Sequence, residues 1–414
     1  MTPRSNHPTK STTDAPSQQN QATPRDAQVW AEWFWATFFP DWCARVQDGA
    51  FGVFDALNEA GEPDFTATKS LLAQARTLFT LSHTALISND PTLIEAARLQ
   101  AAFLQRFHKG GGLYRATALR DGTATGRAED EIARSYDHSF IILGLVTWNR
   151  ISPSKDTAAQ IEACWAALRS TLTDPSTGLL RNDDTGTISN PAQNPHMHLF
   201  EACLQASRMA ITTSDAAIWL TRAADLSEIG LRYFIDQDNG SLTEFLTPDL
   251  HALAGPDGAR REPGHQCEWA WLLWEEAELA KDPSLGTPAT RLIEFADRHC
   301  FSQQGAFKGA AFDAVSTSGE VMEDSFLLWP QTEAIKAFSL RYAAGDVAAG
   351  ERARALMCLM FEQWFADRPT YVNRLDSEGK TIWNEALTRL MYHIVIAMTE
   401  GARAGLWPNL RRLG

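Results

Sequence analysis

Six similar turns recur along the chain at nearly constant spacing, and this repeat constrains the fold more than any other feature. The turns begin at residues 49, 111, 178, 240, 305 and 369, so successive starts are 62 to 67 residues apart. Each begins with a small residue or proline, continues with residues that favour strands and usually closes on Asp or Gly, which is typical of a short hairpin. A period of this length holds two helices of ordinary length and their loops.

The segments between the turns alternate between two kinds of helical pattern. One kind is strongly apolar, as in GHQCEWAWLLWEEAELA (264–280), and the other is amphipathic, as in LTRAADLSEIGLRYF (220–234). The apolar kind suits an inner ring and the amphipathic kind an outer ring. Six such pairs predict an all-α fold, an (α/α)6 barrel of twelve helices with short hairpins in the inter-helix loops. The first turns of the six inner helices would then face one central pocket.

The first 25 residues differ in composition from the rest of the chain. They are rich in Ser, Thr, Pro, Gln and Asn and contain no apolar run, so the sequence predicts a disordered tail and not a signal peptide. Residues 26–414 contain all six repeats and are predicted to form a single catalytic domain.

The bulk composition narrows the class of partner. A formal net charge of −14 disfavours nucleic acid and anionic membrane surfaces, because both recruit Lys and Arg patches, and no apolar run reaches transmembrane length. The six cysteines are scattered without a CxxC pair, which predicts reduced cysteines in a cytoplasmic protein. Fourteen tryptophans suit carbohydrate-binding faces as well as a core.

Polar residues gather at the expected starts of the inner helices. Five of the ten histidines belong to this set. Their recurrence at comparable positions favours a functional role, although a single histidine at a helix start, such as His138, is most often structural. The set comprises Arg76, Tyr136, His138, Asn194, His196, His198, His265, Glu268, Trp329, Gln331, Glu333, Tyr392 and His393.

Several members of this set suit proton transfer on a sugar. His265 and His393 are suited to the transfer itself, because an imidazole titrates near neutral pH. Arg76 could stabilise an oxyanion or enediolate with its permanent charge. Glu268 could orient the ring of His265 or bind a sugar hydroxyl, and Trp329 offers a flat face for a sugar ring, as does Tyr136.

A catalytic metal and glycoside hydrolysis are the chemical alternatives. Residues two apart on a helix diverge by about 200°, so His196 and His198 cannot bind one ion together, and no HExxH motif is present. The sequence therefore predicts no metal. Glycoside hydrolysis needs two carboxylates, and Glu268 has no evident acidic partner among the helix starts.

Four segments resemble the motifs of one known family. They are QNPHMHLFEA (193–202), EPGHQCEWAW (262–271), LWPQTEAIKA (328–337) and YHIV (392–395). They are similar to motifs of the N-acylglucosamine 2-epimerase superfamily, which includes cellobiose 2-epimerases, mannose isomerases and sulfoquinovose isomerases. The resemblance extends over roughly residues 27–408 and implies an (α/α)6 barrel. The HMH element most resembles the D-mannose isomerase group.

The resemblance implies roles for nine residues. His265 and His393 would be the catalytic acid/base pair. The substrate-binding residues would be Arg76, Tyr136, Asn194, His198, Glu268 and Trp329, together with Arg389, which stands where sulfoquinovose isomerases have a neutral residue. No metal and no cofactor are expected.

The resemblance further implies a cofactor-independent aldose–ketose isomerase that interconverts D-mannose and D-fructose, or a closely related free sugar, through an enediolate. The alternative is a sugar 2-epimerase of the N-acylglucosamine or cellobiose type. An (α/α)6 glycoside hydrolase or lyase and a non-catalytic sugar-binding protein are further alternatives. The acidic composition favours an unphosphorylated sugar, and a monomer or homodimer is expected.

Overall fold

The computed structural model of the protein describes residues 26–187, 189–366 and 368–412. The tail predicted for residues 1–25 lies outside the described residues. Within the described part, helices dominate and only short strands occur, which agrees with the predicted all-α class.

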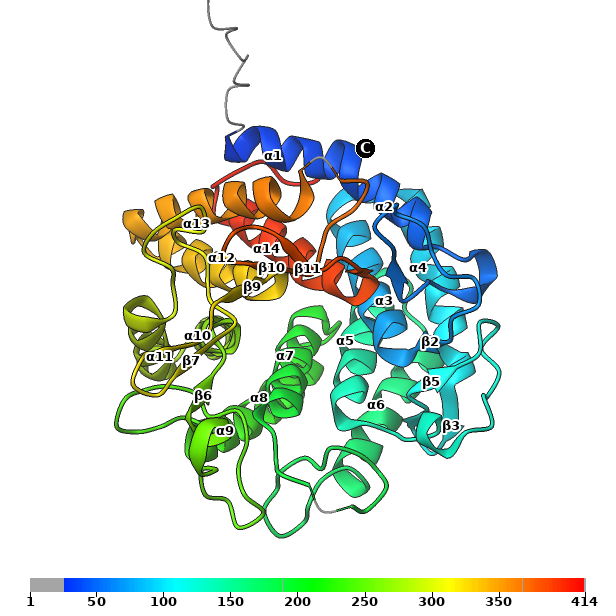
Figure 1. Ribbon diagram of the computed structural model, residues 1–414. Coiled ribbons are helices and arrows are strands. Elements are labelled where there is room, and N and C mark those ends of the chain that lie inside the picture. Colours follow the sequence, from blue (N-terminus) through cyan, green and yellow to red (C-terminus); the bar gives the residue numbers. More distant parts are fainter. Residues whose placement is uncertain (1–25, 188, 367, 413–414) are drawn as a thin grey trace, which may run out of the picture.

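Six helices form an inner ring around a common axis (Figure 1). Neighbours in chain order pack against one another, and the last helix, α14, packs against the first, α3, so that the ring closes. The inner helices are α3 (Leu71–Ser88), α5 (Ser135–Ile151), α7 (Gln193–Met209), α10 (Pro263–Ala280), α12 (Leu328–Ala343) and α14 (Met391–Arg403).

A second ring of helices surrounds the first. With α1 (Ala27–Trp33) and α2 (Phe39–Val46) counted as one helix, joined by a π-helical turn at Phe34–Phe38, the described residues contain six outer helices. The remaining five are α4 (Pro91–Leu104), α6 (Lys155–Ser170), α8 (Thr213–Tyr233), α11 (Gly286–His299) and α13 (Val347–Met360). The predicted barrel of twelve helices is therefore confirmed. Trp30 stacks on Phe361, directly after α13, with ring centroids 5.4 Å apart, so the outer ring also closes.

The two rings differ in how their helices begin. Most outer helices are capped by side chains that accept a backbone N–H of the first turn: Asp26, Asp90, Ser154, Thr212 and Asp346. Among the inner helices only α3 has such a cap, from Ser70. The other five begin without a side-chain cap, and their first turns point toward the rim that carries the site.

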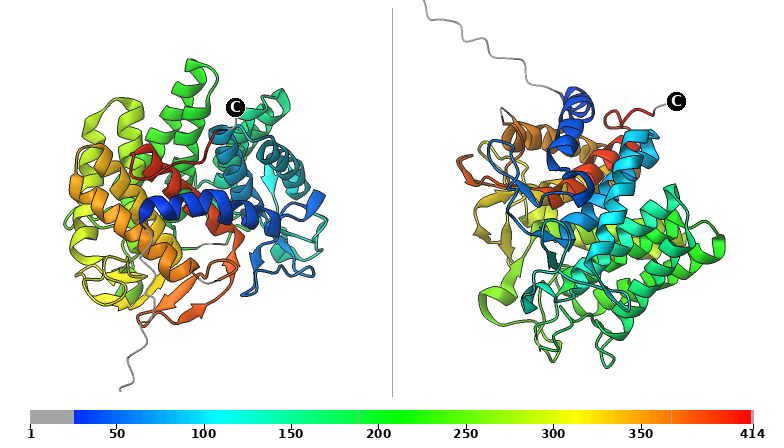
Figure 2. Two further views of the ribbon diagram at one scale, coloured as in Figure 1. Left: turned by 90° about the horizontal axis from the view of Figure 1, so that it is seen from above. Right: turned by 90° about the vertical axis from the view of Figure 1, so that its right-hand side faces the viewer.

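The strands lie in the loops, and Figure 2 shows those of the second half of the chain together at one end of the helices. Three pairs are local hairpins, which confirms the predicted loop hairpins: β3 (His108–Gly110) with β4 (Leu113–Tyr114), β7 (Ala314–Ser316) with β8 (Val321–Glu323), and β10 (Arg374–Asp376) with β11 (Thr381–Trp383).

Other strand pairs join different repeats, and all the pairs are antiparallel. They are β1 (Ala56–Leu57) with β12 (Ala386–Leu387), β2 (Lys69–Ser70) with β5 (Thr117–Ala118), β6 (Arg260–Arg261) with β7, and β9 (Ser325–Leu327) with β10. The β1–β12 pair joins the first loop to the last and so helps to close the barrel. A short additional helix, α9 (Gly255–Ala259), lies in a loop.

One side chain at the same position of five inner helices binds the turn before it. Each accepts a backbone N–H of that turn at 2.8–3.1 Å: Gln74 from Val53, His138 from Tyr114, His196 from Leu180, Gln266 from Leu242 and Gln331 from Ala311. Two of the five histidines that recur at the helix starts therefore have a structural role. Their recurrence reflects the repeat and not a shared site.

The helices and the cysteines were compared with what a membrane span or a disulfide requires. No helix among the described residues is long and apolar enough to cross a membrane. All six cysteines are free thiols, and all except the partly buried Cys358 are buried.

Candidate active site

A cavity of about 240 Å³ opens at the end of the barrel where the inner helices begin. All nine residues to which the family resemblance assigns roles line it, and those roles stay predictions. The cavity is lined by Arg76, Tyr136, Asn194, His198, Glu262, His265, Glu268, Leu327, Trp329, Asn373, Trp383, Leu387, Arg389, Leu390 and His393.

Arg76 joins two of these residues at the base of the cavity. Its Nη1 lies 3.1 Å from Nε2 of His393, and its Nη2 donates to the hydroxyl of Tyr136 at 2.7 Å. The guanidinium also lies 4.1 Å from the centre of the Phe140 ring, a cation–π contact. Because a guanidinium only donates, Nε2 of His393 must be the acceptor and carry no proton.

His393 is held on its other side by a carboxylate. Its Nδ1 lies 2.7 Å from Oε1 of Glu333, so a neutral ring carries its proton on Nδ1 and donates it to Glu333. Burial lowers the pKa of His393 well below its ordinary value, and the positive charges of Arg76 and Lys336 lower it further. At neutral pH His393 is therefore an unprotonated base whose free nitrogen faces Arg76.

His265 has the opposite surroundings. Its Nδ1 lies 2.8 Å from Oε2 of Glu244 and 3.3 Å from Oε2 of Glu262. Burial lowers the pKa of His265, but the Glu244 carboxylate, by charge and by hydrogen bond, raises it, and Glu262 and Glu268 add to this, so that the pKa is about 9. At neutral pH His265 is an imidazolium, and therefore an acid. Of the two roles expected for Glu268, holding this ring is contradicted, because Glu244 does so, and binding a sugar hydroxyl stays a prediction.

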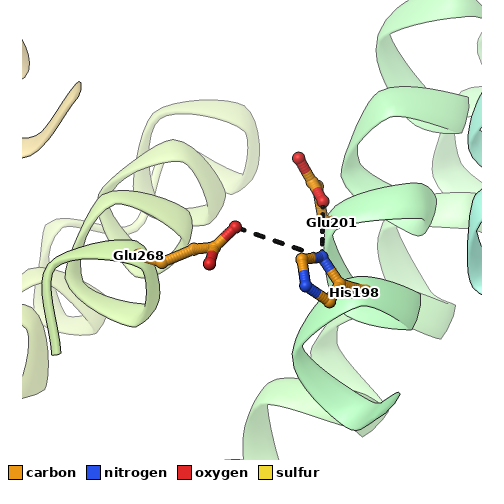
Figure 3. Close-up of side chains that lie close together, drawn as sticks. All are labelled: His198, Glu201 and Glu268. Carbon is orange, nitrogen blue, oxygen red and sulfur yellow. Dashed lines mark hydrogen bonds and ion pairs between the residues drawn. The ribbon is translucent and has the colours of Figure 1, made fainter. Parts of the chain in front are cut away.

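Glu268 instead faces His198 and Glu201 on the neighbouring inner helix, α7. Figure 3 shows Glu268 reaching from α10 toward the two residues on α7. Nδ1 of His198 lies 3.0 Å from Oε2 of Glu201 and 4.0 Å from Oε1 of Glu268. Burial lowers the pKa of His198 well below its ordinary value, so this ring is neutral. Tyr392 donates its hydroxyl to the second oxygen of Glu201.

A lysine lies behind this cluster. The Nζ of Lys336 makes an ion pair with Oε2 of Glu333 and lies 3.7 Å from Oε1 of Glu268. It also lies 4.1 Å from the centre of the Trp271 ring. Its side chain is fully buried and does not line the cavity. Lys336 therefore supplies positive charge to a group of carboxylates without meeting a ligand.

Trp329 covers one side of His265. The two ring centroids are 4.8 Å apart, and the contact depends on a glycine in the first turn of α10. A Cβ atom on Gly264 would lie 2.2 Å from the Trp329 ring, a distance that no side chain tolerates without movement. The PGH segment therefore needs its glycine to bring the indole and the imidazole together.

Several buried polar atoms at the cavity have no hydrogen-bond partner among the described residues. They are both carboxylate oxygens of Glu268, Oδ1 of Asn194 and Nδ2 of Asn373. Buried polar atoms are normally hydrogen-bonded, and exceptions need an explanation. Acceptors and a donor left free in one small cavity suit a ligand with several hydroxyl groups.

Some residues of the site were missed by the sequence reasoning. Glu244 and Asn373 lie in loops and Trp383 ends β11, so helical periodicity gives no signal for any of them. Glu262 is the N-cap of α10, directly before the PGH segment. Its acidic side chain close to a histidine is the sequence feature that could have indicated its place in the site. Glu333 belongs to the polar residues at the helix starts, but the sequence predicts no functional role for it.

The expectation that Glu268 has no acidic partner nearby is also wrong. Glu262 lines the same cavity, and the charges of Glu201 and Glu333 act on the same group of residues. The absence of a second acid therefore no longer counts against glycoside hydrolysis.

Three groups of side chains among the described residues bring possible metal ligands within 4.8 Å of one another. They are His198, Glu201 and Glu268; Glu244, Glu262 and His265; and Glu268, Glu333 and His393. Two of these groups already contain or contact a positive charge, which disfavours a cation: His265 is itself an imidazolium, and Lys336 contacts Glu333 and Glu268. His196 lies outside all three, because it binds the backbone of Leu180. The expectation of no catalytic metal stays a prediction.

Known proteins resemble this chain over most of its length. A protein named mannose-6-phosphate isomerase from Rhizobium meliloti is 27% identical over 387 residues, which are 89% of this chain and 95% of that protein. A D-mannose isomerase from Marinomonas mediterranea is 24% identical over 75% of this chain and 78% of its own.

Solved structures confirm the fold. A D-mannose isomerase has a TM-score of 0.78 at 20% identity and covers 94% of this chain and 100% of its own. A cellobiose 2-epimerase from Bacillus thermoamylovorans has a TM-score of 0.78 at 13% identity, with 90% and 98% covered. The model of the family N-acylglucosamine 2-epimerase (GlcNAc 2-epimerase) matches residues 52–397. The chain therefore belongs to the N-acylglucosamine 2-epimerase family, a family of sugar epimerases and isomerases.

Proposed function

We propose that the protein is a cofactor-independent aldose–ketose isomerase that interconverts D-mannose and D-fructose. One observation carries the proposal: His265 and His393 line one cavity, and carboxylates raise the pKa of His265 against burial, whereas burial, Arg76 and Lys336 lower that of His393. An aldose–ketose isomerisation needs a base for a carbon-bound proton and an acid for an oxygen at the same pH. The names of the relatives from Rhizobium meliloti and Marinomonas mediterranea support mannose as the sugar.

The size of the cavity favours a single sugar. Ligand pockets usually measure roughly 300–1,000 Å³, and this one measures about 240 Å³. Trp329 offers a flat apolar face on one side, and the unpaired oxygens of Glu268 offer acceptors on the other. A monosaccharide fits this combination better than a disaccharide does.

Ring opening is the first step. The imidazolium of His265 donates a proton to the ring oxygen O5 as the C1–O5 bond breaks. The O1 hydroxyl loses its proton to a base, and the open-chain aldehyde forms. His198 is suited to accept that proton through Nε2, because Glu201 holds its Nδ1 at 3.0 Å and the ring is neutral. The proton on His198 then passes through solvent to His265, which restores the starting state of both rings.

Isomerisation follows on the open chain. Nε2 of His393 removes the C2 proton while His265 protonates O1, which gives an enediol. His393 then returns its proton to C1, and O2 gives its proton back to His265, which leaves the ketose. Each histidine ends as it began, so no co-reactant is needed. Arg76 must release Nε2 of His393 when the sugar binds, and its guanidinium is then free to stabilise negative charge on the enediolate oxygen.

A phosphorylated hexose is a second candidate substrate. The relative from Rhizobium meliloti carries the name mannose-6-phosphate isomerase. Arg389 lines the cavity, and its guanidinium makes no ion pair with any described residue. Arginine binds phosphate well, although a single cation in an acidic chain favours the free sugar.

Epimerisation is the alternative outcome of the same chemistry. If the proton returned to the opposite face of C2 and not to C1, the product would be a 2-epimer. The solved cellobiose 2-epimerases share this fold, so the direction of proton return has to be measured.

Product analysis in heavy water tests the proposal. The purified protein is incubated with D-mannose, D-fructose, mannose 6-phosphate, N-acetylglucosamine and cellobiose in D2O, and the products are followed by NMR. We expect mannose to give fructose, with deuterium at C1 in proportion to how far the proton held by His393 exchanges with solvent before its return. An aldose product with deuterium at C2, formed without any ketose, would show that the protein is an epimerase and not an isomerase. Failure to convert any of the five sugars would contradict the proposal.

A further inference from the structure

Lys336 occupies an unusual place for a lysine. Its side chain is fully buried on α12, at 0% exposure, one turn beyond Glu333. A fully buried lysine is rare unless it is paired, because removing an ammonium from water is costly. Lys336 does not line the cavity, and so its charge must act through a neighbour.

That neighbour is Glu333, whose two oxygens have different partners. Oε1 lies 2.7 Å from Nδ1 of His393 and 3.3 Å from the hydroxyl of Thr332. Oε2 makes the ion pair with Lys336. The carboxylate of Glu333 thus connects the buried ammonium directly to the imidazole that faces the cavity.

Apart from Lys336 and the two groups bound to Oε1, the surroundings of Glu333 disfavour its charge. Burial raises the pKa of Glu333 well above its ordinary value, the charges of Glu268 on α10 and Glu201 on α7 add to this, and the charge and hydrogen bond of Lys336 lower it. The hydrogen-bond donors on the remaining sides are Tyr392, which binds Glu201, and Arg76 on α3, which binds His393. Lys336 is the cation in contact with Glu333 among the described residues. Its ion pair with Oε2 favours the ionised carboxylate, and its loss would favour the protonated carboxyl group.

The protonation state of Glu333 decides which nitrogen of His393 is free. An ionised Glu333 accepts the proton of Nδ1, and Nε2 then keeps the lone pair that faces the cavity. A protonated Glu333 would donate to Nδ1 and drive the ring proton to Nε2. Nε2 would then meet the N–H groups of Arg76 at 3.1 Å, donor against donor, and His393 could no longer accept a proton from a sugar.

We propose that Lys336 is a positioning residue for catalysis: by keeping Glu333 ionised, it holds His393 in the tautomer whose Nε2 accepts the proton from carbon. The catalytic effect rests on the proposed role of His393 as the base. The effect on the tautomer does not, because it belongs to the protein without substrate. The competing interpretation is a structural ion pair that only stabilises the core.

Nitrogen NMR of the histidine rings separates the two interpretations. The ring nitrogens of His393 are observed in the ¹⁵N-labelled, ligand-free protein and are identified by the signals that His393→Gln removes. In the wild type we expect a protonated Nδ1 and an unprotonated Nε2. In Lys336→Met, which keeps the length of the side chain but not its charge, we expect the proton on Nε2 and a fall in kcat of about 10- to 100-fold, within the usual contribution of a positioned base.

Lys69 provides a matched control. It is also a buried lysine paired with a carboxylate, since its Nζ lies 2.8 Å from Asp48 at 1% exposure, but it does not contact Glu333 or His393. Lys69→Met should lower the melting temperature and leave the His393 nitrogens unchanged. Lys336→Arg, which retains the charge, should keep the wild-type tautomer and most of kcat.

Two results would overturn the inference. One is the wild-type tautomer of His393 in Lys336→Met, whatever its stability. Should that variant not fold, Glu333→Gln reports on the same link, because an amide replaces the carboxylate, and a wild-type tautomer there would equally refute it. If the tautomer changes as expected while the sugar products differ from those proposed, the proposed function fails and the role of Lys336 stands.

Discussion

Replacing Glu244 by glutamine tests how His265 is kept protonated. The amide has nearly the same shape as the carboxylate, so the 2.8 Å contact with Nδ1 and the 3.0 Å hydrogen bond from Gln193 have room to remain. The negative charge is lost, together with the hydrogen bond that Oε1 accepts from the backbone N–H of Glu262 at 3.2 Å. Because Glu244 is the strongest influence that raises the pKa of His265 against burial, the pKa should fall.

The expected size of the effect follows from the pKa. A fall from about 9 to the ordinary value of about 6.5 corresponds to roughly 3 kcal/mol less stabilisation of the imidazolium. At pH 8 the protonated fraction would drop from about 90% to about 3%, a loss of roughly 30-fold in the acid form. Glu262 remains 3.3 Å away, so the smallest shift we expect is about one pH unit, or roughly 1.4 kcal/mol.

The pH dependence of kcat/KM measures this shift, because it reports the groups of the free enzyme. An acid acts while it is protonated, so the alkaline limb should lie near pH 9 in the wild type and at lower pH in Glu244→Gln. At pH 6 the two proteins should differ little. An NMR titration of the His265 ring gives the pKa without substrate. An unchanged alkaline limb together with an unchanged ring titration would refute the assignment of His265 as an acid held by Glu244.

Four further outcomes are expected. His265→Ala and His393→Ala should each lower kcat by at least about 10²-fold while circular dichroism shows a folded protein; wild-type rates would make the pair structural. Trp329→Ala should raise KM more than it lowers kcat, because stacking and not proton transfer is lost. Gly264→Ala should destabilise the protein by roughly 1–3 kcal/mol in thermal unfolding, since its Cβ would lie 2.2 Å from the indole. Dialysis against a strong chelator should leave the rate unchanged, and activity restored only by one divalent cation would contradict this.

The barrel was predictable because the same kind of turn recurs six times along the sequence. Each turn is a weak indication on its own, but six turns at 62 to 67 residues leave room only for paired helices. The same repetition misled the interpretation of the histidines. His138 and His196 recur because each fills the position that Gln74, Gln266 and Gln331 fill elsewhere, where a side chain must accept a backbone N–H.

The groups that tune the histidines could not be found by helical spacing. Glu244 lies in a turn, 21 residues before the histidine that it binds. The turn is brought to the site by a backbone bridge between Ala192 and Phe245 and by the N–H of Gln193, which donates to the carbonyl of Glu244. Neither contact has a side-chain signature in the sequence. The residues at the starts of the inner helices, by contrast, share one geometry, which is why eight of the thirteen predicted there line the cavity.

The two histidines differ because of the charges that surround each His–Glu pair. Each binds a carboxylate through Nδ1, at 2.8 Å for His265 and 2.7 Å for His393. His265 has a second acid, Glu262, and no cation in contact among the described residues, so its proton is stabilised. His393 has Arg76 against its free nitrogen and Lys336 behind its carboxylate. The same His–Glu pair thus becomes an acid on one wall of the cavity and a base on the other.

Because both states hold between the low pKa of His393 and the pKa of about 9 of His265, a carbon can lose a proton while an oxygen gains one over a broad range around neutral pH. We expect a plateau of kcat/KM across that range, and a narrow optimum near pH 6.5 would show that both histidines have ordinary pKa values and share one role.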